Sequence, residues 1–248
     1  MKESEKKFAG LKALFLNCSI TPQKEHSHTQ LLMNKAANVM EAEGVAVTQI
    51  YMREHAVAIG MVTDGADIGQ KDDWPSIQKE ILAADILVMG TPIWLGVKSS
   101  MATLAIERMY AHSGERNEKG QYRYYGKTGG CVITGNEDGI KHCAMDILYA
   151  LQHIGYTIPP QADCGWIGEA GPGPSYGDTQ WQGKPIGDGA TPVGYDNDFT
   201  NRNTTFMAWN LMHTAKRLRE AGGLPAEGNV ADDWMHVTNA KNANPEYR

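Results

Sequence analysis

The sequence predicts an α/β fold in which a doubly wound, five-stranded parallel sheet is covered by helices on both faces. Short apolar runs alternate along the chain with segments of helical periodicity, and parallel strands need such crossover connections. The chain has 248 residues, enough for one substantial core, so we expect a single domain over residues 1–248. Its hydrophobic content of 42% and charged content of 21% are those of an ordinary globular protein.

Five segments have the composition of buried strands. The first is a mostly apolar run that is followed by polar turn formers, and the second alternates and is rich in β-branched residues. The third is expected to end at Pro92, and the fifth has the weakest pattern. The predicted strands are residues 11–17, 45–51, 85–91, 127–134 and 156–163.

Five segments between and after these strands carry apolar residues at helical spacing. The first is expected to begin near Ser27 and to stop at Gly44, because serine favours the start of a helix and glycine its end. The predicted helices are residues 27–44, 75–84, 99–112, 140–154 and 200–221.

A long inserted loop near the C-terminus interrupts this alternation. Residues 165–199 are rich in Gly and Pro but also contain Trp166, Tyr176, Trp181 and other aromatic residues. A simple linker would lack these aromatics, so we expect an ordered loop. The chain then divides into a core at about 11–163, this insertion, and a C-terminal helix and tail at about 200–248.

The charge balance argues against some classes of partner. A formal net charge of -6 disfavours nucleic acid and anionic membranes, which attract concentrated Lys and Arg. The first ten residues are polar, and no segment reaches the roughly 18 apolar residues of a membrane span. We therefore expect a cytoplasmic protein whose partners are small molecules.

The four cysteines are spread along the chain and form no Cys-x-x-Cys pair of the kind found in metal sites and redox dithiols. We interpret Cys18, Cys131, Cys143 and Cys164 as free thiols, and we expect no metal site.

The first candidate site is the loop at residues 17–29, which joins the first strand to the first helix. Ligands of doubly wound sheets bind at the carboxyl ends of the strands. The loop is rich in hydroxyl side chains, and a helix N-terminus offers unpaired N–H groups that suit a phosphate. The alternative is that Ser and Thr only cap the helix. The loop lacks the glycine motifs of nucleoside triphosphate and dinucleotide sites.

Two further loops follow the third and fourth strands. Residues 90–100 contain Pro92, Trp94 and two glycines, and could present backbone groups to a flat ring. The alternative is that they form an ordinary strand end with Trp94 in the core. Residues 134–139, Thr-Gly-Asn-Glu-Asp-Gly, could line the other side of the same crevice or form an ordinary turn.

Taken together in this order, the three loops resemble those of the NAD(P)H-dependent FMN reductases of the flavodoxin-like superfamily, over roughly residues 11–163. The resemblance implies a flavodoxin-like fold and bound flavin mononucleotide (FMN). It assigns the phosphate to the first loop, and the flavin ring and ribityl chain to the other two. The implied cofactor-binding residues are Ser19, Ser27, His28, Thr29, Pro92, Ile93, Trp94, Leu95, Gly96, Thr134, Gly135, Asn136, Asp138 and Gly139.

The resemblance also implies a function. NADPH or NADH would reduce the flavin at N5, and a small acceptor such as a quinone, nitro compound or flavin would reoxidise it, so no side chain is assigned as a catalytic acid or base. A homodimer or homotetramer is implied as well. One departure is Gln23 and Lys24, where many relatives carry an Arg. The alternatives are a flavodoxin-type electron carrier that docks on proteins, and a nonenzymatic protein that retains the fold.

Overall fold

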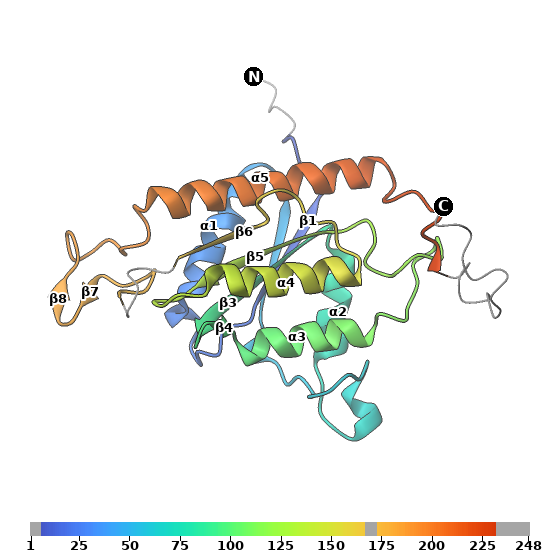
Figure 1. Cartoon of the computed structure of the whole chain (residues 1–248), viewed down its shortest axis with the longest axis horizontal. Helices are drawn as coiled ribbons and strands as arrows, with labels where there is room; N and C mark the ends of the chain where they lie inside the picture. Colours follow the sequence, from blue (N-terminus) through green and yellow to red (C-terminus); the bar gives the residue numbers. More distant parts are fainter. Residues whose placement is uncertain (1–5, 167–172, 232–248) are drawn as a thin grey trace.

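The computed structural model describes residues 6–166 and 173–231, which form a parallel sheet between two layers of helices (Figure 1). The strand order is β2-β1-β3-β5-β6, with all four neighbouring pairs parallel. This confirms the predicted flavodoxin-like class. The strands are β1 Lys12–Asn17, β2 Ala46–Tyr51, β3 Ile86–Trp94, β5 Thr128–Thr134 and β6 Asp163–Trp166.

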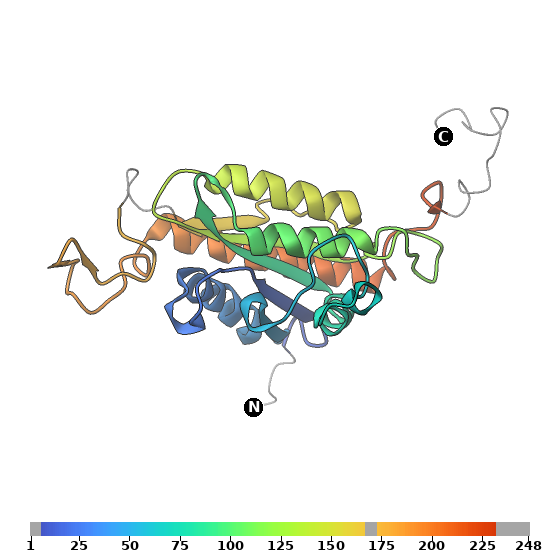
Figure 2. The ribbon, with the colours of Figure 1, turned by 90° about the horizontal axis from the view of Figure 1, so that it is seen from below.

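The helices cover both faces of the sheet, as Figure 2 shows from below. One face packs against α1 and α5, and the other packs against α2, α3 and α4. The helices are α1 His28–Ala42, α2 Trp74–Ala83, α3 Ser100–Ala111, α4 Ile140–Ile154 and α5 Asp198–Glu220. Three short helical turns lie at Lys24–His26, Met52–Glu54 and Gly65–Ile68.

The third strand is longer than the sequence predicts, because β3 continues through Pro92 to Trp94. Pro92 lies opposite Thr134 of β5 at the end of the pairing, where a missing N–H costs least. Leu95 and Gly96 then adopt positive φ angles and turn the chain into β4, Val97–Lys98, which pairs antiparallel with the end of β3. The predicted second loop is therefore largely a tight hairpin.

The predicted fifth strand is wrong in position. Residues 156–163 contribute one isolated bridge, between Thr157 and Thr128, and the paired strand β6 begins at Asp163. Pro159 and Pro160 lie in the predicted segment, and proline has no backbone N–H to donate to a neighbouring strand. The last strand therefore forms only after the prolines.

The insertion begins beyond β6 and contains a small hairpin of β7 Gln180–Trp181 and β8 Lys184–Pro185, at one end of the molecule in Figure 1. Tyr176 is fully buried and packs against the rings of Trp166 and Tyr195. A Cβ on Gly194 would lie 2.0 Å from the Tyr176 ring, so this close contact requires glycine. These contacts order the insertion, as its aromatic residues predict.

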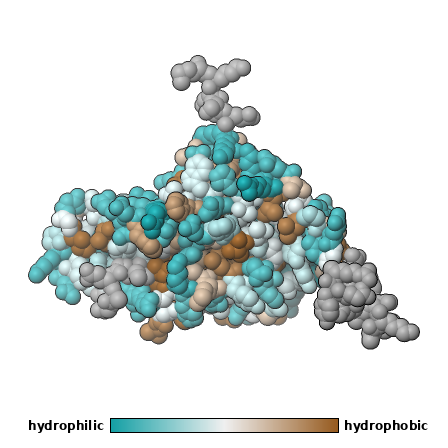
Figure 3. Space-filling view, turned by 45° about the horizontal axis from the view of Figure 1, so that its top comes forward, coloured by the Kyte–Doolittle hydropathy of each residue, from teal (hydrophilic) through white to brown (hydrophobic). Residues whose placement is uncertain are grey.

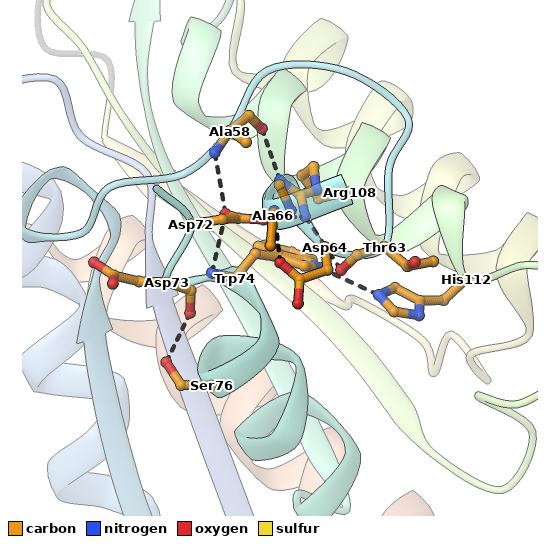
Figure 4. Close-up of polar contacts among 11 residues, drawn as sticks. Ala58, Thr63, Asp64, Ala66, Asp72, Asp73, Trp74, Ser76, Arg108 and His112 are labelled. Atoms are coloured by element: carbon orange, nitrogen blue, oxygen red, sulfur yellow. Dashed lines mark hydrogen bonds and ion pairs between the residues drawn. The ribbon is translucent and has the colours of Figure 1, made fainter. Parts of the chain in front are cut away.

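The segment between β2 and α2 is fastened by a buried ion pair (Figure 4). Arg108 Nη2 of α3 lies 2.6 Å from Asp72 Oδ2, and both side chains are almost fully buried. Burial alone raises the pKa of Asp72, but hydrogen bonds from Arg108 and from backbone N–H groups outweigh it, so the pKa lies below its usual value. The carbonyls of Ala58 and Thr63 accept further bonds from Arg108.

The surface in Figure 3 is mostly hydrophilic, with several apolar patches. All four cysteines are buried free thiols. Within the described ranges, no helix is long and apolar enough to cross a membrane.

Candidate functional site

A cleft of about 320 Å³ lies at the carboxyl ends of β1, β3 and β5. It brings together the three loops that the sequence singles out, and the insertion adds one residue. Its lining residues are Ser19, Thr21, His26, Ser27, His28, Thr29, Pro92, Ile93, Trp94, Thr134, Gly135, Asn136, Glu137 and Ser175.

The first loop is shaped by short-range hydrogen bonds. The Asn17 side chain accepts the N–H of Ser19 at 2.9 Å, which folds the chain back directly after β1. The hydroxyls of Ser19 and Ser27 then lie 2.8 Å apart, although eight residues separate them. Both serines are almost fully buried, so the loop presents a fixed pair of hydroxyl groups to the cleft.

Ser27 also caps α1, because its hydroxyl accepts the N–H of Gln30 at 3.1 Å. The helix is 15 residues long, and the other N–H groups of its first turn have no partner within the helix. In the same first turn, the hydroxyl of Thr29 lies 2.7 Å from that of Thr134 and joins the first loop to the third. Amide and hydroxyl donors thus converge at a helix end that favours an anion.

The cleft contains no lysine or arginine among its lining residues. Gln23 and Lys24, which replace the expected arginine, do not line it. An anion here would be bound by neutral donors and by the helix terminus, as the composition of the first loop predicts.

The second and third loops are held together by contacts between the backbone of one and a side chain of the other. The N–H of Leu95 donates to the carboxylate of Glu137 at 3.0 Å. A Cβ on Gly135 would lie 2.9 Å from the Ile93 side chain, so only glycine allows this approach. Trp94 remains 52% exposed at the rim, which excludes the alternative that it is a core residue and leaves its ring available to a flat ligand.

His28 is held by the insertion. Its Nδ1 accepts the N–H of Gly177 at 2.9 Å, and its Nε2 lies 3.7 Å from a carboxylate oxygen of Asp178. Because Nδ1 accepts a hydrogen bond, the ring is neutral with its proton on Nε2. Burial lowers the pKa of His28, although the carboxylate of Asp178 partly offsets this. The imidazole therefore fastens the insertion to the start of α1.

Ten of the fourteen residues expected at the site line the cleft, namely Ser19, Ser27, His28, Thr29, Pro92, Ile93, Trp94, Thr134, Gly135 and Asn136. The other four do not. Leu95 is 91% exposed at the tip of its turn, and Gly96 packs against Gly139. Asp138 and Gly139 line a different cavity.

Four lining residues were absent from the sequence prediction: Thr21, His26, Glu137 and Ser175. Thr21 and His26 lie inside the predicted first loop, so the prediction of that loop already included their positions. Ser175 lies in the insertion and has no such signal, because contacts of its neighbours, Gly173 with Asn136 and Gly177 with His28, bring it near the cleft.

Residues 11–167 match the family described as NADPH-dependent FMN reductase. Over 216 residues, the chain is 33% identical to the 8-demethyl-8-aminoriboflavin-5'-phosphate synthase of Streptomyces davaonensis, covering 85% of this chain and 79% of that protein. It is 53% identical over 214 residues to a Mycobacterium bovis protein named divalent metal cation transporter MntH. That match covers 86% of this chain, which spans 30% of the relative's length.

Among solved structures, RosB with the bound intermediate 8-demethyl-8-formylriboflavin-5'-phosphate superposes with a TM-score of 0.78 at 30% identity. The superposition covers 93% of this chain and 88% of RosB. It thus extends beyond the part that matches the family. A flavone reductase shares the fold, with a TM-score of 0.56 at 14% identity. That superposition covers 85% of this chain and 65% of the flavone reductase chain.

Proposed function

Because the chain belongs to the NADPH-dependent FMN reductase family, we propose that it binds FMN in the cleft and transfers electrons from NADPH or NADH to a small acceptor such as a quinone, nitro compound or flavin. The observation that carries this proposal is the convergence of the Ser19 and Ser27 hydroxyls on the N-terminus of α1. This end of the cleft suits a phosphate, and the hairpin and third loop suit a flat ring.

Each part of the cleft has a separate task in this proposal. Ser19, Ser27 and the first amides of α1 hold the phosphate. The backbone of Gly135 and the ring of Trp94 lie against the flavin, which supplies the redox chemistry when it is bound. The remaining exposure of the rim leaves room for a nicotinamide or an acceptor to approach. A cytoplasmic location, where NAD(P)H is available, is part of this proposal.

A spectroscopic experiment tests the whole reaction. The purified protein is supplemented with FMN, and NADH or NADPH is added without oxygen while the flavin absorbance is followed. Bleaching of bound flavin, and its recovery when a quinone is added, would support the reductase. Bound flavin that neither nicotinamide reduces would favour the electron carrier. Failure of the folded protein to bind FMN would contradict both.

The phosphate assignment is tested with a matched pair of variants. Ser27 and Ser99 are both buried serines that cap a helix, and Ser99 does not line the cleft. Ser27→Ala should weaken FMN binding roughly 10-fold or more, since a hydrogen bond to a charged group is lost. Ser99→Ala should lower FMN affinity less than Ser27→Ala, because the Ser99 hydroxyl contacts the first loop only through the carbonyl of Cys18, at 2.6 Å. Equal affinities of the two variants would remove Ser27 from the site.

A second candidate function is chemical modification of the flavin itself. It is favoured by the 93% coverage of this chain in the RosB superposition, which includes regions outside the family match. Mass analysis of the flavin after turnover separates the two candidates. A reductase releases FMN of unchanged mass, whereas a flavin-modifying enzyme releases a product of different mass.

We further propose that the protein is a homodimer or homotetramer. Leu95, Met145 and Tyr149 are all strongly exposed, and large apolar side chains at the surface commonly mark an interface. Light scattering should give at least twice the 27.2 kDa chain mass. Tyr149→Glu should lower that mass, whereas a monomeric wild-type protein would contradict this part of the proposal.

A further inference from the structure

A second cavity, which we call the edge cavity, lies across the third loop from the cleft. Its volume of about 840 Å³ exceeds that of the cleft. The two share no lining residue, but Glu137 and Ser175 line the cleft while their chain neighbours Asp138 and Pro174 line the edge cavity. The third loop and the start of the described part of the insertion therefore separate them.

The edge cavity is built where the edge strand β6 ends, between the starts of α4 and α5 and beneath the insertion. Its lining residues are Asp138, Gly139, Ile140, Lys141, His142, Asp163, Cys164, Gly165, Trp166, Pro174, Ile186, Val193, Asn197, Phe199, Thr200 and Asn203. A cavity of several hundred cubic ångströms with mainly apolar walls is typical of a small-molecule site.

Aromatic side chains form part of the wall. Trp166 is 9% exposed and is fixed by its indole N–H, which donates to the carbonyl of Pro174 at 3.2 Å. Phe199, in the first turn of α5, is 58% exposed although it is large and apolar. Apolar surface left in contact with water favours a ligand that covers it.

Apart from the Asp138 carboxylate, which accepts the N–H of Gly139, the described polar groups of the wall offer hydrogen bonds without an unpaired charge. The Lys141 ammonium lies 2.5 Å from the Asp163 carboxylate, so the two charges neutralise each other. His142 Nδ1 lies 2.9 Å from the carbonyl of Gly96 and donates to it, because a carbonyl oxygen can only accept. The Asn203 amide makes no side-chain hydrogen bond to the described residues, so its NH₂ can donate to a ligand.

We propose that the edge cavity binds an uncharged, planar aromatic molecule with a ring carbonyl, of the quinone or aromatic ketone class. The ring would pack between Trp166 and Phe199, and the Asn203 amide would donate to the carbonyl. An anionic ligand would lose its hydration without gaining an unpaired cation from the described lining residues, and the Asp138 carboxylate would oppose it. The site is separate from the flavin cleft, so this binding does not depend on the proposed reductase function.

The test uses chromone, a neutral aromatic ketone, and its charged analogue chromone-2-carboxylate. Each is titrated into the full-length protein by calorimetry, with and without saturating FMN. Chromone should bind at one site with the same Kd in both conditions, and the carboxylate should bind more weakly. Competition between FMN and chromone would place chromone in the cleft and overturn the proposal, as would tighter binding of the carboxylate or no binding of chromone to the folded protein.

Variants locate the bound chromone. Phe199→Ala and Asn203→Leu should each raise the chromone Kd about fivefold, which corresponds to the loss of one aromatic contact or one hydrogen bond. Phe206→Ala is the matched control, because Phe206 is also an exposed phenylalanine of α5 but does not line the cavity. Since Phe199 is exposed, its replacement should not unfold the protein. An equal loss in Phe206→Ala, or none in Phe199→Ala, would overturn the proposal.

Discussion

The two edge strands of the sheet, β2 and β6, are each followed by a long segment, and the two segments are fastened in different ways. The first, residues 52–73, is held by the buried carboxylate of Asp72, which pairs with the guanidinium of Arg108. The same carboxylate accepts hydrogen bonds from the backbone N–H groups of Ala58, Gly65 and Trp74. The second, residues 173–197 of the insertion, is fastened by the buried Tyr176 ring and by the neutral His28.

The difference lies in what each fastening touches. Arg108 and Asp72 belong to α3 and the 52–73 segment, and neither lines the cleft. His28 is the first residue of α1 and lines the cleft, and it also holds Gly177 of the insertion. The first segment therefore stabilises the fold, whereas the second contacts a residue of the candidate site.

The largest effect is expected from breaking the buried ion pair. Arg108→Ala leaves the Asp72 carboxylate buried without its counter-charge and should lower the free energy of unfolding by about 3–5 kcal/mol, measured by urea denaturation. Glu220→Ala, which breaks the exposed pair with Lys216, should cost less than about 1 kcal/mol. Similar losses of unfolding free energy in the two variants would show that the buried pair stabilises the fold no more than a surface pair does.

A smaller effect is expected from displacing the insertion. On Gly177, a Cβ would lie 2.5 Å from the Leu31 side chain and 2.8 Å from His28 Nδ1, so Gly177→Ala should cost about 1–3 kcal/mol. Limited proteolysis should then cut the insertion faster, and FMN should bind more weakly. Gly114→Ala is the control, because nothing lies within 4 Å of a Cβ there. Unchanged FMN affinity in Gly177→Ala would uncouple the insertion from the cleft.

A pH change should loosen the same contact more gently. Burial lowers the pKa of His28 in the docked state below the value of about 6.5 in an open chain. Well above pH 6.5 the imidazole is neutral in both states and docking is most favourable. As the pH falls through 6.5, the open state takes up the proton first and docking weakens. The hydrogen-exchange protection factor of the Gly177 amide should therefore be lower at pH 5 than at pH 7.5.

An amide in the sheet is the control for this pH prediction. The N–H of Cys131 donates to the carbonyl of Ala162 and has no histidine partner, so its protection factor should stay constant. A constant protection factor at Gly177 would show that His28 does not control docking.

The smallest effect is expected at Tyr176. Its hydroxyl is buried and makes no hydrogen bond within the described structure, so Tyr176→Phe should change the free energy of unfolding by less than about 0.5 kcal/mol. Tyr124→Phe should cost about 1–3 kcal/mol, because the Tyr124 hydroxyl accepts from Gln78 and donates to Met109. A large loss in Tyr176→Phe would show that the hydroxyl, and not only the ring, anchors the insertion.

Much of the fold was predictable because its signals are local. The helix at 140–154 has the predicted bounds, since glycines flank it on both sides and apolar residues recur along one face. Ser27 caps α1 as predicted, for the same local reason. The strand predicted at 156–163 was wrong, because its apolar pattern outweighed two prolines that cannot donate to a neighbour.

Local signals were enough to predict the alternation of strands and helices and to single out the three loops at the carboxyl edge of the sheet. Periodicity, capping residues and loop composition all act between near neighbours in the chain. Two features could be seen only in the tertiary structure: His28 binds the insertion, and Asp138 and Gly139 line the edge cavity. His28 and Gly177 are 149 residues apart, so their contact depends on how the whole sheet and both its helical layers pack.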